Sequence, residues 1–338
     1  MNSINPCNRE RNLGLDILKV WMSFEVVLCN FGHGSEAWIY SHFFAYFKRM
    51  AVPVFMIVSF YLSARFISDK EWHLEKLAKR LYRIYWPLVA WGIICWIVYN
   101  ILALLCNADD FKYSFSDLVW QVLTGHCYNP PMWFNAVLGC LTILFYNICK
   151  AGAKYNTAII VLVSLLAVFA TYSGLNNVFI TLRGELNYPL GRMAEMIPYA
   201  GLGLLLYKCK QDKKYHNLIV FVVSIVLVKE LCGTLYDGES VNYHYSGVKL
   251  FFCSTSLVAF FIICDFNKIP ILFKRAVTFL SGYSMGVYCI HLLVGRILGL
   301  SSIDMDPFYK SVLIYLLSLA ICYCISRIPN KNINNVVV

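Results

Sequence analysis

The stretch IYWPLVAWGIICWIVYNILALL, residues 84–105, contains no charged side chain over a length that would cross a lipid bilayer as a helix. A hydrocarbon core of about 30 Å requires around 20 apolar residues in α-helical conformation. Backbone polar groups in lipid must be paired inside the segment, which an uninterrupted helix achieves, whereas a barrel strand would be about ten residues long with alternating polarity. The stretch therefore predicts a transmembrane helix.

Similar windows recur along the chain, which is 59% hydrophobic and only 14% charged. Ordinary soluble domains are about 45–50% apolar and about 25% charged, so this composition excludes a water-exposed globular surface. No repeat, low-complexity tract or linker divides the sequence, and we predict a single membrane-embedded domain over residues 1–338. The predicted fold is an all-α membrane bundle of about ten transmembrane helices, at 13–32, 51–67, 84–105, 132–149, 156–173, 193–207, 217–231, 248–264, 277–297 and 308–326.

The distribution of positive charge predicts the orientation of these helices. Of the 29 lysines and arginines, nineteen fall in or beside one set of connections and nine in or beside the other, with Lys19 inside the first window. Cytoplasmic loops carry the excess of positive charge, so the richer set is predicted to be cytoplasmic. Both termini then lie in the cytoplasm. The formal charge of +10 is explained by this topology and indicates no nucleic-acid partner.

The fourteen cysteines form no C-x-x-C pair, and most of them lie in apolar windows. There they act as small hydrophobic residues, so we predict neither a metal site nor a structural disulfide. The longest predicted cytoplasmic connection, residues 66–83, has amphipathic spacing and is expected to lie along the membrane surface as a helix. The longest outer connections are rich in Tyr, Asn, Asp and His, which suits a polar or sugar-like ligand. Nothing in the sequence indicates an oligomeric state.

Helix one, residues 13–32, carries a polar stripe. At 100° per residue, Asp16, Lys19 and Asn30 fall on one face together with Asn12 and Ser23. Ionisable groups inside lipid cost about 2.5–3.5 kcal/mol each near a helix centre, so this face must contact protein or water. Lys19 and Asn30 are eleven residues apart, about 16.5 Å along the axis, and could line a path through much of the bilayer. Alternatively, Asp16 and Lys19 simply neutralise one another.

Two further buried polar groups are candidates for chemistry. Glu25 lies on the opposite side of helix one, where it must be protonated or paired with another helix. In the predicted helix 277–297, Ser284, Tyr288 and His291 share one face. An isolated histidine in a helix is more often a hydrogen-bonded core residue than a functional one. The alignment of His291 with a hydroxyl and a phenol makes either role plausible.

Five ordered fragments resemble the acyltransferase-3 family of membrane acyltransferases. LDILKVWMSFEVVLCNFG (15–32) is similar to the family's helix one, and AVPVFMIVSFYL (51–62) to its A-V-P-x-F-F-x-x-S-G-Y-L. KRLYRIYWPLVAW (79–91) resembles its R-x-x-R element followed by P-x-x-x-W. PPMWFNAVLG (130–139) resembles L-W-F-L-x-A-L-x-G, and GYSMGVYCIHLLV (282–294) is close to Y-S-x-G-I-Y-L-I-H.

The resemblance implies transfer of an acyl group, commonly acetyl from acetyl-CoA, to a hydroxyl of a cell-surface or lipid-linked glycan in the bacterial cytoplasmic membrane. Acyl-CoA would be the donor, the glycan and the lipid bilayer the partners. Arg80 and Arg83 match R-x-x-R and, with Lys79, would bind the phosphates of CoA, although a positive-inside anchor would look the same. Ser59 and Trp133 belong to the matched fragments and are expected to be substrate-facing or structural positions.

The family's helix one pairs an arginine with a histidine taken as the catalytic base, and these positions are Lys19 and Asn30 here. Lysine keeps the positive charge, but an asparagine amide cannot accept a proton from a hydroxyl. One reading is that His33, Glu25 or His291 serves as the base while Asn30 orients the substrate. A second is that no helix-one base is needed. His33 is one turn beyond Asn30 and is the first candidate replacement.

A third reading is that the protein is a degenerate family member that exports or binds glycans or acyl groups without catalysis. A lipid-linked-sugar glycosyltransferase fits less well, because such enzymes place acidic residues in the first outer loop, which here offers only Glu36. The sequence identifies neither the acyl group nor the acceptor sugar, nor the membrane face where the acceptor is modified.

Overall fold

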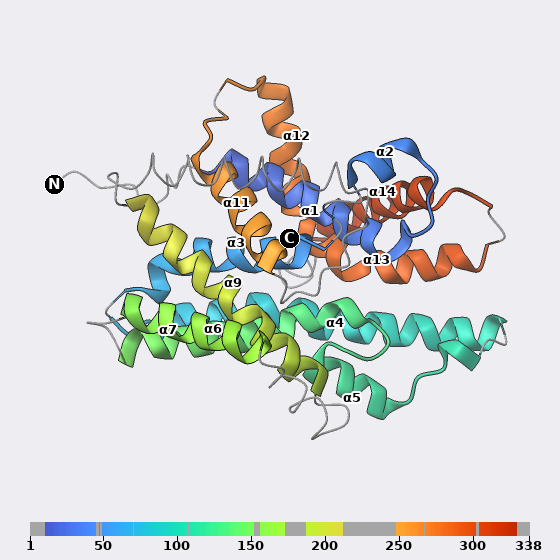
Figure 1. Ribbon diagram of the computed structural model, residues 1–338. Helices are drawn as coiled ribbons and strands as arrows, with labels where there is room; N and C mark the ends of the chain where they lie inside the picture. The colour runs from blue at the N-terminus through green and yellow to red at the C-terminus, as the bar shows by residue number, and fades with distance from the viewer. Residues whose placement is uncertain are drawn as a thin grey trace.

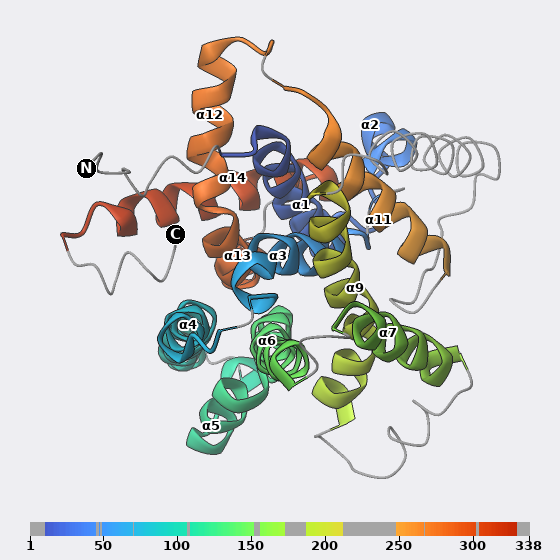
Figure 2. The same ribbon diagram turned by 90° about the vertical axis from the view of Figure 1, so that its left-hand side faces the viewer.

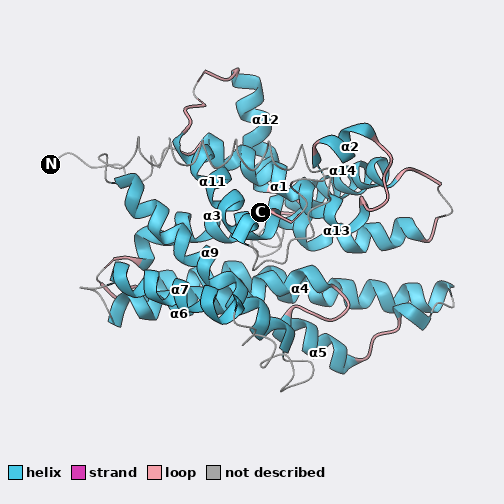
Figure 3. Cartoon of the chain, viewed as in Figure 1, coloured by secondary structure: helices cyan, strands magenta, loops and turns pink. Residues whose placement is uncertain are grey.

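The structure is a computed structural model, and every regular element among the described residues is a helix (Figure 3). The described residues are 11–44, 47, 49–69, 71–106, 109–151, 156–172, 187–211, 248–266, 268–301 and 304–329. Their α-helices are α1 (Leu13–Phe31), α2 (Trp38–His42), α3 (Ala51–Ile67), α4 (Leu74–Cys106), α5 (Phe115–Thr124), α6 (Trp133–Ala151), α7 (Asn156–Tyr172), α9 (Asn187–Gln211), α11 (Val248–Ile263), α12 (Ile271–Gly282), α13 (Ser284–Gly299) and α14 (Pro307–Ser326).

The long helices form one bundle around α3. Helices α3, α4 and α6 extend across Figure 1 and are seen nearly end-on in Figure 2, so they run roughly parallel or antiparallel to one another. Helix α3 contacts α1, α6, α9 and α11. Short connections join α3 to α4 and α6 to α7, which makes each of these pairs antiparallel. Residues at the end of α1, the start of α3 and the start of α6 line one cavity, so these three ends lie at the same end of the bundle.

The bundle has large apolar side chains on its outside as well as inside. Leu104 of α4 is 80% exposed and Phe169 of α7 is 65% exposed, whereas Ser23, Asn129 and Ser318 are almost fully buried. A soluble protein would not expose such large apolar side chains on neighbouring helices, but lipid chains solvate them without penalty. The arrangement is that of a multi-pass membrane protein.

Length and composition identify three described segments that could each cross a membrane, namely α4, Pro130–Ala151 and α14. The bent pair α12 and α13 could provide a fourth. Helices α3 and α11 are apolar but shorter, and α1 carries three ionisable residues. The predicted total of ten spans and the cytoplasmic position of both termini stay predictions, and the predicted window 217–231 lies outside the described residues.

The predicted window 277–297 is not one helix. Helix α12 ends at Gly282, α13 begins at Ser284, and the two axes differ by 60°. The Arg11 guanidinium stabilises this end of α12, because its Nη2 donates to Thr278 O at 3.1 Å and to Ser281 Oγ at 2.8 Å. Carbonyl groups in the last turn of a helix lack intrahelical partners, and a cation there satisfies them.

The connection 66–83 does not form the separate surface helix that the sequence predicts. Residues from Leu74 onward form the first turns of α4, which continues without a break for 33 residues and contains Pro87. Good helix formers and an ion pair between Glu75 and Lys79, one turn apart, favour this extension.

The helix that does run across the bundle is α12. It stands nearly upright in both Figure 1 and Figure 2, across the direction of α4 and α6. Ile271 is 65% exposed, Leu272 is 78% exposed, and Lys274 and Arg275 lie in the same helix. Exposed apolar and basic side chains on one crosswise helix are typical of a helix in the membrane interface.

Helices α3 and α9 approach closely at Gly203, where an added Cβ would lie 2.8 Å from Phe60 Cβ and 2.9 Å from Tyr61 N. We expect Gly203→Ala to lower the melting temperature by several degrees, because the two helices must move apart and overpacking costs about 1–3 kcal/mol. Thermal unfolding in detergent measures this effect. Gly191→Ala on the same helix is the matched control, since nothing lies within 4 Å of its added Cβ. Equal melting of the two variants would contradict the close approach.

Candidate functional site

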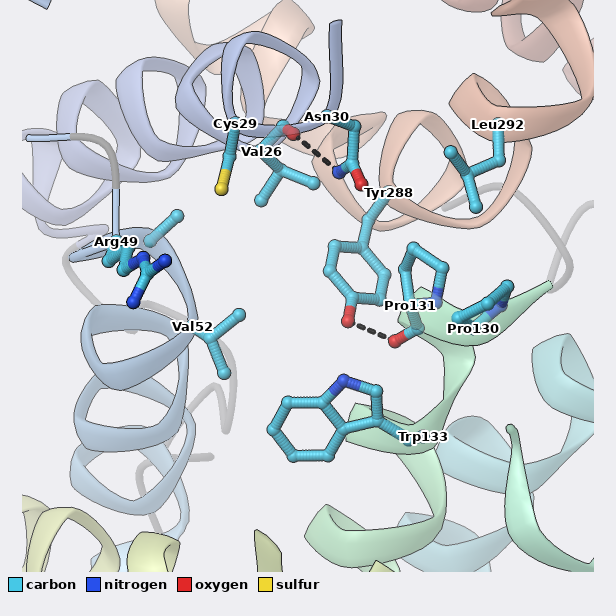
Figure 4. Close-up of a pocket in the computed structure, with 11 residues that line it drawn as sticks. Val26, Cys29, Asn30, Arg49, Val52, Pro130, Pro131, Trp133, Tyr288 and Leu292 are labelled. Carbon is cyan, nitrogen blue, oxygen red and sulfur yellow. Dashed lines mark hydrogen bonds between the residues drawn. The ribbon is translucent and has the colours of Figure 1, made fainter. Parts of the chain in front are cut away.

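A cavity of about 220 Å³ lies at the end of the bundle where α1 ends and α3 begins (Figure 4). It is smaller than the roughly 300–1,000 Å³ of sites for drug-sized ligands, and suits one small group such as a sugar ring. Four segments that are distant in sequence contribute its walls. The lining residues are Val26, Cys29, Asn30, Arg49, Ala51, Val52, Pro130, Pro131, Trp133, Tyr288 and Leu292.

Asn30 on the cavity wall is hydrogen-bonded to His291, which is fully buried behind it. The Asn30 Nδ2 atom lies 3.1 Å from His291 Nε2 and 2.8 Å from Val26 O. Both hydrogens of the amide nitrogen are used when it donates to these two acceptors. The amide oxygen of Asn30 makes neither of these bonds, and the side chain is exposed to the cavity. It can accept a hydrogen bond from a hydroxyl there.

The backbone of α13 determines the tautomer of His291. Its Nδ1 atom lies 2.8 Å from Tyr288 O and 3.2 Å from Val287 O. Carbonyl oxygens only accept, so Nδ1 carries the hydrogen. Nε2 of the neutral ring then holds a lone pair, which accepts the hydrogen bond from Asn30. An imidazole in this state can act as a base at Nε2.

Tight contacts hold α13 and α6 around the cavity. The Tyr288 hydroxyl donates to the Pro131 carbonyl, and the Phe31 ring packs edge-on at 6.4 Å from the His291 ring. Gly295 allows this approach, because a Cβ there would overlap the Phe31 ring. Trp133, 4% exposed, has the Arg192 guanidinium 5.8 Å from its ring centroid. Hydrogen bonds and ring packing therefore hold the side chains of these walls in place.

The other end of the α1 polar stripe forms an ion-pair cluster. Lys19 Nζ lies 2.8 Å from Asp16 Oδ1, and Arg11 pairs with the other oxygen of the same carboxylate. Neutralisation of Asp16 by Lys19 was one of the alternatives from the sequence, and the structure contains that pair. Lys19 is eleven residues from Asn30 and does not line the cavity.

The middle of the stripe is packed against protein. Ser23 is 1% exposed, and its hydroxyl lies 3.2 Å from the Tyr315 hydroxyl of α14. Asn12 caps α1 through Leu15 N at 3.1 Å. The stripe thus contacts α12, α14 and α13 in turn, and it forms no open path along its described length.

The other proposed bases lie away from the cavity. Glu25 is fully buried, and its Oε1 accepts from Trp21 Nε1 at 3.0 Å, a residue of the same helix. His33 is exposed in the turn after α1. The cavity is lined by neither residue. Of the three histidine and glutamate candidates, only His291 is brought to Asn30.

The connection after α1 is hydrogen-bonded to Asp306, the residue before α14. Ser35 Oγ donates to Asp306 Oδ1 at 2.7 Å, and Glu36 N donates to Asp306 Oδ2 at 3.1 Å. The same carboxylate caps α14 by accepting from Phe308 N at 2.8 Å. These hydrogen bonds, with that from Ser35 the largest contribution, hold the pKa of Asp306 below its usual value. The ionised carboxylate thereby positions the chain that follows Asn30.

The predicted donor-binding residues lie on α4, whose Arg80 reaches the middle of α3. Arg80 Nη2 is 3.5 Å from Ser59 O, and Arg80 Nε is buried with no hydrogen-bond partner among the described residues. Arg83, one turn further, is exposed. Lys79 is also exposed and pairs with Glu75. Arg80 thus keeps an unused guanidinium donor beside an exposed arginine.

Ser284, the first residue of α13, is buried, and its hydroxyl has no hydrogen-bond partner among the described residues. It does not line the cavity with Tyr288. Two lining residues, Arg49 and Cys29, are not identified by sequence reasoning as site residues. A sequence signal for Arg49 exists, because it is one of nine positive charges on the predicted outer side and lies two residues before the fragment at 51–62. In the described part of the chain, no three His, Cys, Asp or Glu side chains are placed to hold a metal ion.

The fold and cavity define a multi-pass membrane protein with a small, partly open site between helices that is lined by both polar and apolar side chains. The family model described as an acyltransferase domain, that of the acyltransferase-3 family, matches residues 12–327, so the chain belongs to this family. Membership confirms the resemblance of the five fragments and indicates a membrane acyltransferase. No significant match exists among curated proteins or among solved structures.

The tautomer of His291 is directly measurable. We expect ¹⁵N NMR of histidine-labelled protein to show a neutral ring with Nδ1 protonated, assigned by its loss in His291→Gln. In Asn30→Leu the Nε2 resonance should move, because its hydrogen-bond donor is removed, while Nδ1 stays protonated. His33→Gln is the control and should leave the His291 signals in place. A proton found on Nε2 would contradict the arrangement.

Proposed function

We propose that the protein transfers an acyl group, commonly acetyl, from cytoplasmic acyl-CoA to a hydroxyl of a cell-surface or lipid-linked glycan. We further propose that it acts in the cytoplasmic membrane of a bacterium, with both termini inside. Family membership supports acyl transfer. The observation that carries the proposal is the hydrogen-bonded pair of Asn30 and His291, because it supplies a basic nitrogen at the position where Asn30 has none.

In this proposal His291 is the general base. The acceptor hydroxyl replaces the Asn30 amide as the donor to His291 Nε2, and the Asn30 side chain turns aside within the cavity. The hydroxyl oxygen attacks the thioester carbonyl carbon while Nε2 takes its proton. The C–S bond then breaks, the ester remains on the acceptor, and the imidazolium returns the proton to the leaving thiolate. The orientation of the ring by the two backbone carbonyls supports this role.

The residues of α4 support a donor site at the cytoplasmic end. The buried Nε of Arg80 has no hydrogen-bond partner among the described residues, and Arg83 beside it is exposed. Arginine binds phosphate groups through its fork of donors, so this pair suits the phosphates of CoA.

The two ends of the proposed route are joined by α3. Its Ser59 carbonyl contacts Arg80 and its Val52 side chain lines the cavity. Seven residues of helix separate them, about 10 Å along the axis. An acyl group on an extended thioester arm would have to cover this distance to reach Asn30 and His291. In this proposal both termini are cytoplasmic, as the positive-inside rule predicts, so the cavity and the acceptor lie near the outer face.

A second candidate function is export or binding of glycans or acyl groups by a protein that does not catalyse transfer. The observation in its favour is Asn30 at the position of the family's histidine. The packing of Ser23 against Tyr315 argues against a polar path along α1. Catalysis therefore accounts better for the described site.

Substitution of His291 tests the proposed base. We expect His291→Gln to reduce acyl transfer from labelled acetyl-CoA by about 10²–10⁴, the usual contribution of a general base. Glutamine can still hydrogen-bond to Asn30, so thermal unfolding should change little. Asn30→Ala should keep transfer within about tenfold of the unmodified protein, because it uncovers Nε2. The measurement is transfer to membrane glycans in vesicles containing the purified protein.

Variants of other residues distinguish His291 from His33 as the base, and an active enzyme from a degenerate family member. His33→Ala should retain activity, and its loss with His291→Gln unaffected would identify His33 as the base instead. His73→Gln, at the opposite end of the bundle, is the control for a change of histidine alone. Activity appearing only in Asn30→His would show that the natural protein is a degenerate member. Mass spectrometry of glycans with and without the gene identifies the modified sugar.

Arg80→Gln and Arg83→Ala test the donor site. Each is expected to raise the KM for acetyl-CoA at least about tenfold, because one charge-assisted contact to phosphate is lost, with a smaller effect on kcat. Lys76→Gln is the matched control, because it removes an exposed positive charge from the same helix at a position outside the predicted donor-binding residues. An unchanged KM in both arginine variants would exclude them from donor binding.

A further inference from the structure

The wall of the cavity that contains Pro130 and Pro131 belongs to the turn between α5 and α6, residues 125–132. This turn is not α-helical, and yet Asn129 and Met132 within it are fully buried. Backbone groups of a buried segment need hydrogen-bond partners, which an irregular turn cannot supply in full by itself. The partners that side chains provide therefore determine where the two prolines lie.

The side chain of Gln121, on α5, makes three hydrogen bonds to the backbone of this turn. Its Oε1 atom accepts from Cys127 N at 2.8 Å and from Asn129 N at 3.1 Å, and its Nε2 atom donates to Asn129 O at 3.1 Å. Gln121 is fully buried, so these bonds are shielded from water. One amide thus fixes the backbone of residues 127–129 against α5.

The side chain of Asn129 joins the same turn to α13. Its Nδ2 atom donates to Cys289 O at 3.0 Å and lies 3.6 Å from Cys95 Sγ on α4. A carbonyl only accepts, so the nitrogen end of the Asn129 amide must face α13. Cys289 follows Tyr288, whose hydroxyl donates to the Pro131 carbonyl (Figure 4). The turn and α13 are therefore joined twice, and each of them supplies one of the two side chains.

These contacts reach the candidate base through the ring of Tyr288. This ring lies on the cavity wall, 6.2 Å from the His291 ring, and the Tyr288 carbonyl accepts from His291 Nδ1. A shift of the turn would move the Pro131 carbonyl away from the Tyr288 hydroxyl. The tyrosine ring would then lose its hydrogen bond and turn within the cavity, beside the group that is proposed to take the proton.

We propose that Gln121 and Asn129 are positioning residues, which set the place of the proline wall and the orientation of Tyr288 beside His291. Neither of the two lines the cavity, so they act through the residues that do. The inference rests on the proposed function for the reaction that these residues serve. The placement of the two rings is independent of that reaction and is measured without an acyl donor.

Asn129→Leu tests the proposal, because leucine keeps most of the side-chain volume and removes the donor. We expect acyl transfer from labelled acetyl-CoA to membrane glycans to fall by about 10–100-fold per folded protein, since a misplacement of about 1 Å can cost about 10²-fold in rate. Size-exclusion chromatography in detergent measures the folded fraction.

Asn100→Leu is the matched control. The Asn100 Nδ2 atom donates to Trp96 O at 2.9 Å, and its Oδ1 accepts from Tyr113 N at 3.2 Å, so this amide also holds a connection against a helix. Asn100 does not line the cavity and does not contact α13 through these bonds. The control loses a similar pair of contacts and should keep its acyl transfer.

A second readout is ¹⁵N NMR of the full-length, histidine-labelled protein without acetyl-CoA. In Asn129→Leu we expect the His291 signals to shift or to split into more than one set, because the neighbouring Tyr288 ring is no longer held. Asn100→Leu should leave these signals in place. Gln121→Met removes the three hydrogen bonds to the turn and should have the same effect as Asn129→Leu.

A double variant tests whether Asn129 acts through Tyr288. If it does, the loss of transfer in Asn129→Leu combined with Tyr288→Phe should not exceed the larger of the two single losses, because both changes break one set of contacts. A loss equal to the product of the two single losses would overturn the proposal.

The remaining outcomes are equally decisive. Transfer and His291 signals that match those of Asn100→Leu would overturn the proposal, and a failure of both Asn129→Leu and Gln121→Met to fold would assign the pair to folding alone. Shifted His291 signals in these variants, without any acyl transfer by the unmodified protein, would support the positioning of the rings and contradict the proposed function.

Discussion

The polar side chains of α1 must be satisfied inside an apolar bundle, and the arrangement of its neighbours follows from that constraint. Asp16 pairs with Lys19 and Arg11, Ser23 lies against Tyr315, and Asn30 donates to His291. An unpaired polar group in lipid costs several kcal/mol, so Ser23 and Asn30 each hold one helix against α1, and Arg11 beside Asp16 holds α12 by donating to Thr278 O and Ser281 Oγ. Helices α12, α14 and α13 are thereby placed around one helix, in that order along its length.

The bend between α12 and α13 allows the chain to contact Arg11 through α12 and Asn30 through α13. Arg11 holds the end of α12 through Thr278 and Ser281, beside the Asp16 carboxylate. The bend that follows turns α13 along the bundle, where it contacts α1, α4 and α14. His291 reaches Asn30 as a result of this turn. The ion-pair cluster and the candidate base therefore depend on each other through the geometry of two short helices.

Sequence patterns predict the apolar helices well and the contacts between them poorly. The window 51–67 coincides with α3, because an apolar run flanked by charge has one stable arrangement in lipid. Arg11 contacts the end of α12 although it is 267 residues from Thr278, and no local pattern contains that contact. Asn30 and His291 belong to two separate fragments, so their pairing requires the fold. The position of Arg49 in the cavity is missed for the same reason, because it depends on which helices meet around that residue.

The exchange of histidine for asparagine at position 30 is chemically coherent with a histidine at 291. Neutral imidazole has one donor and one acceptor, and the carbonyls of Val287 and Tyr288 already take the donor. A neighbour for Nε2 must therefore offer an N–H, which an amide always has and a second imidazole has in only one tautomer. The Asn30 amide donates a hydrogen bond to the buried Nε2 atom of His291 and does not add a second basic nitrogen. The family fragment at 282–294 also ends in a histidine, so the departure at position 30 leaves His291 in place and changes only its hydrogen-bond partner.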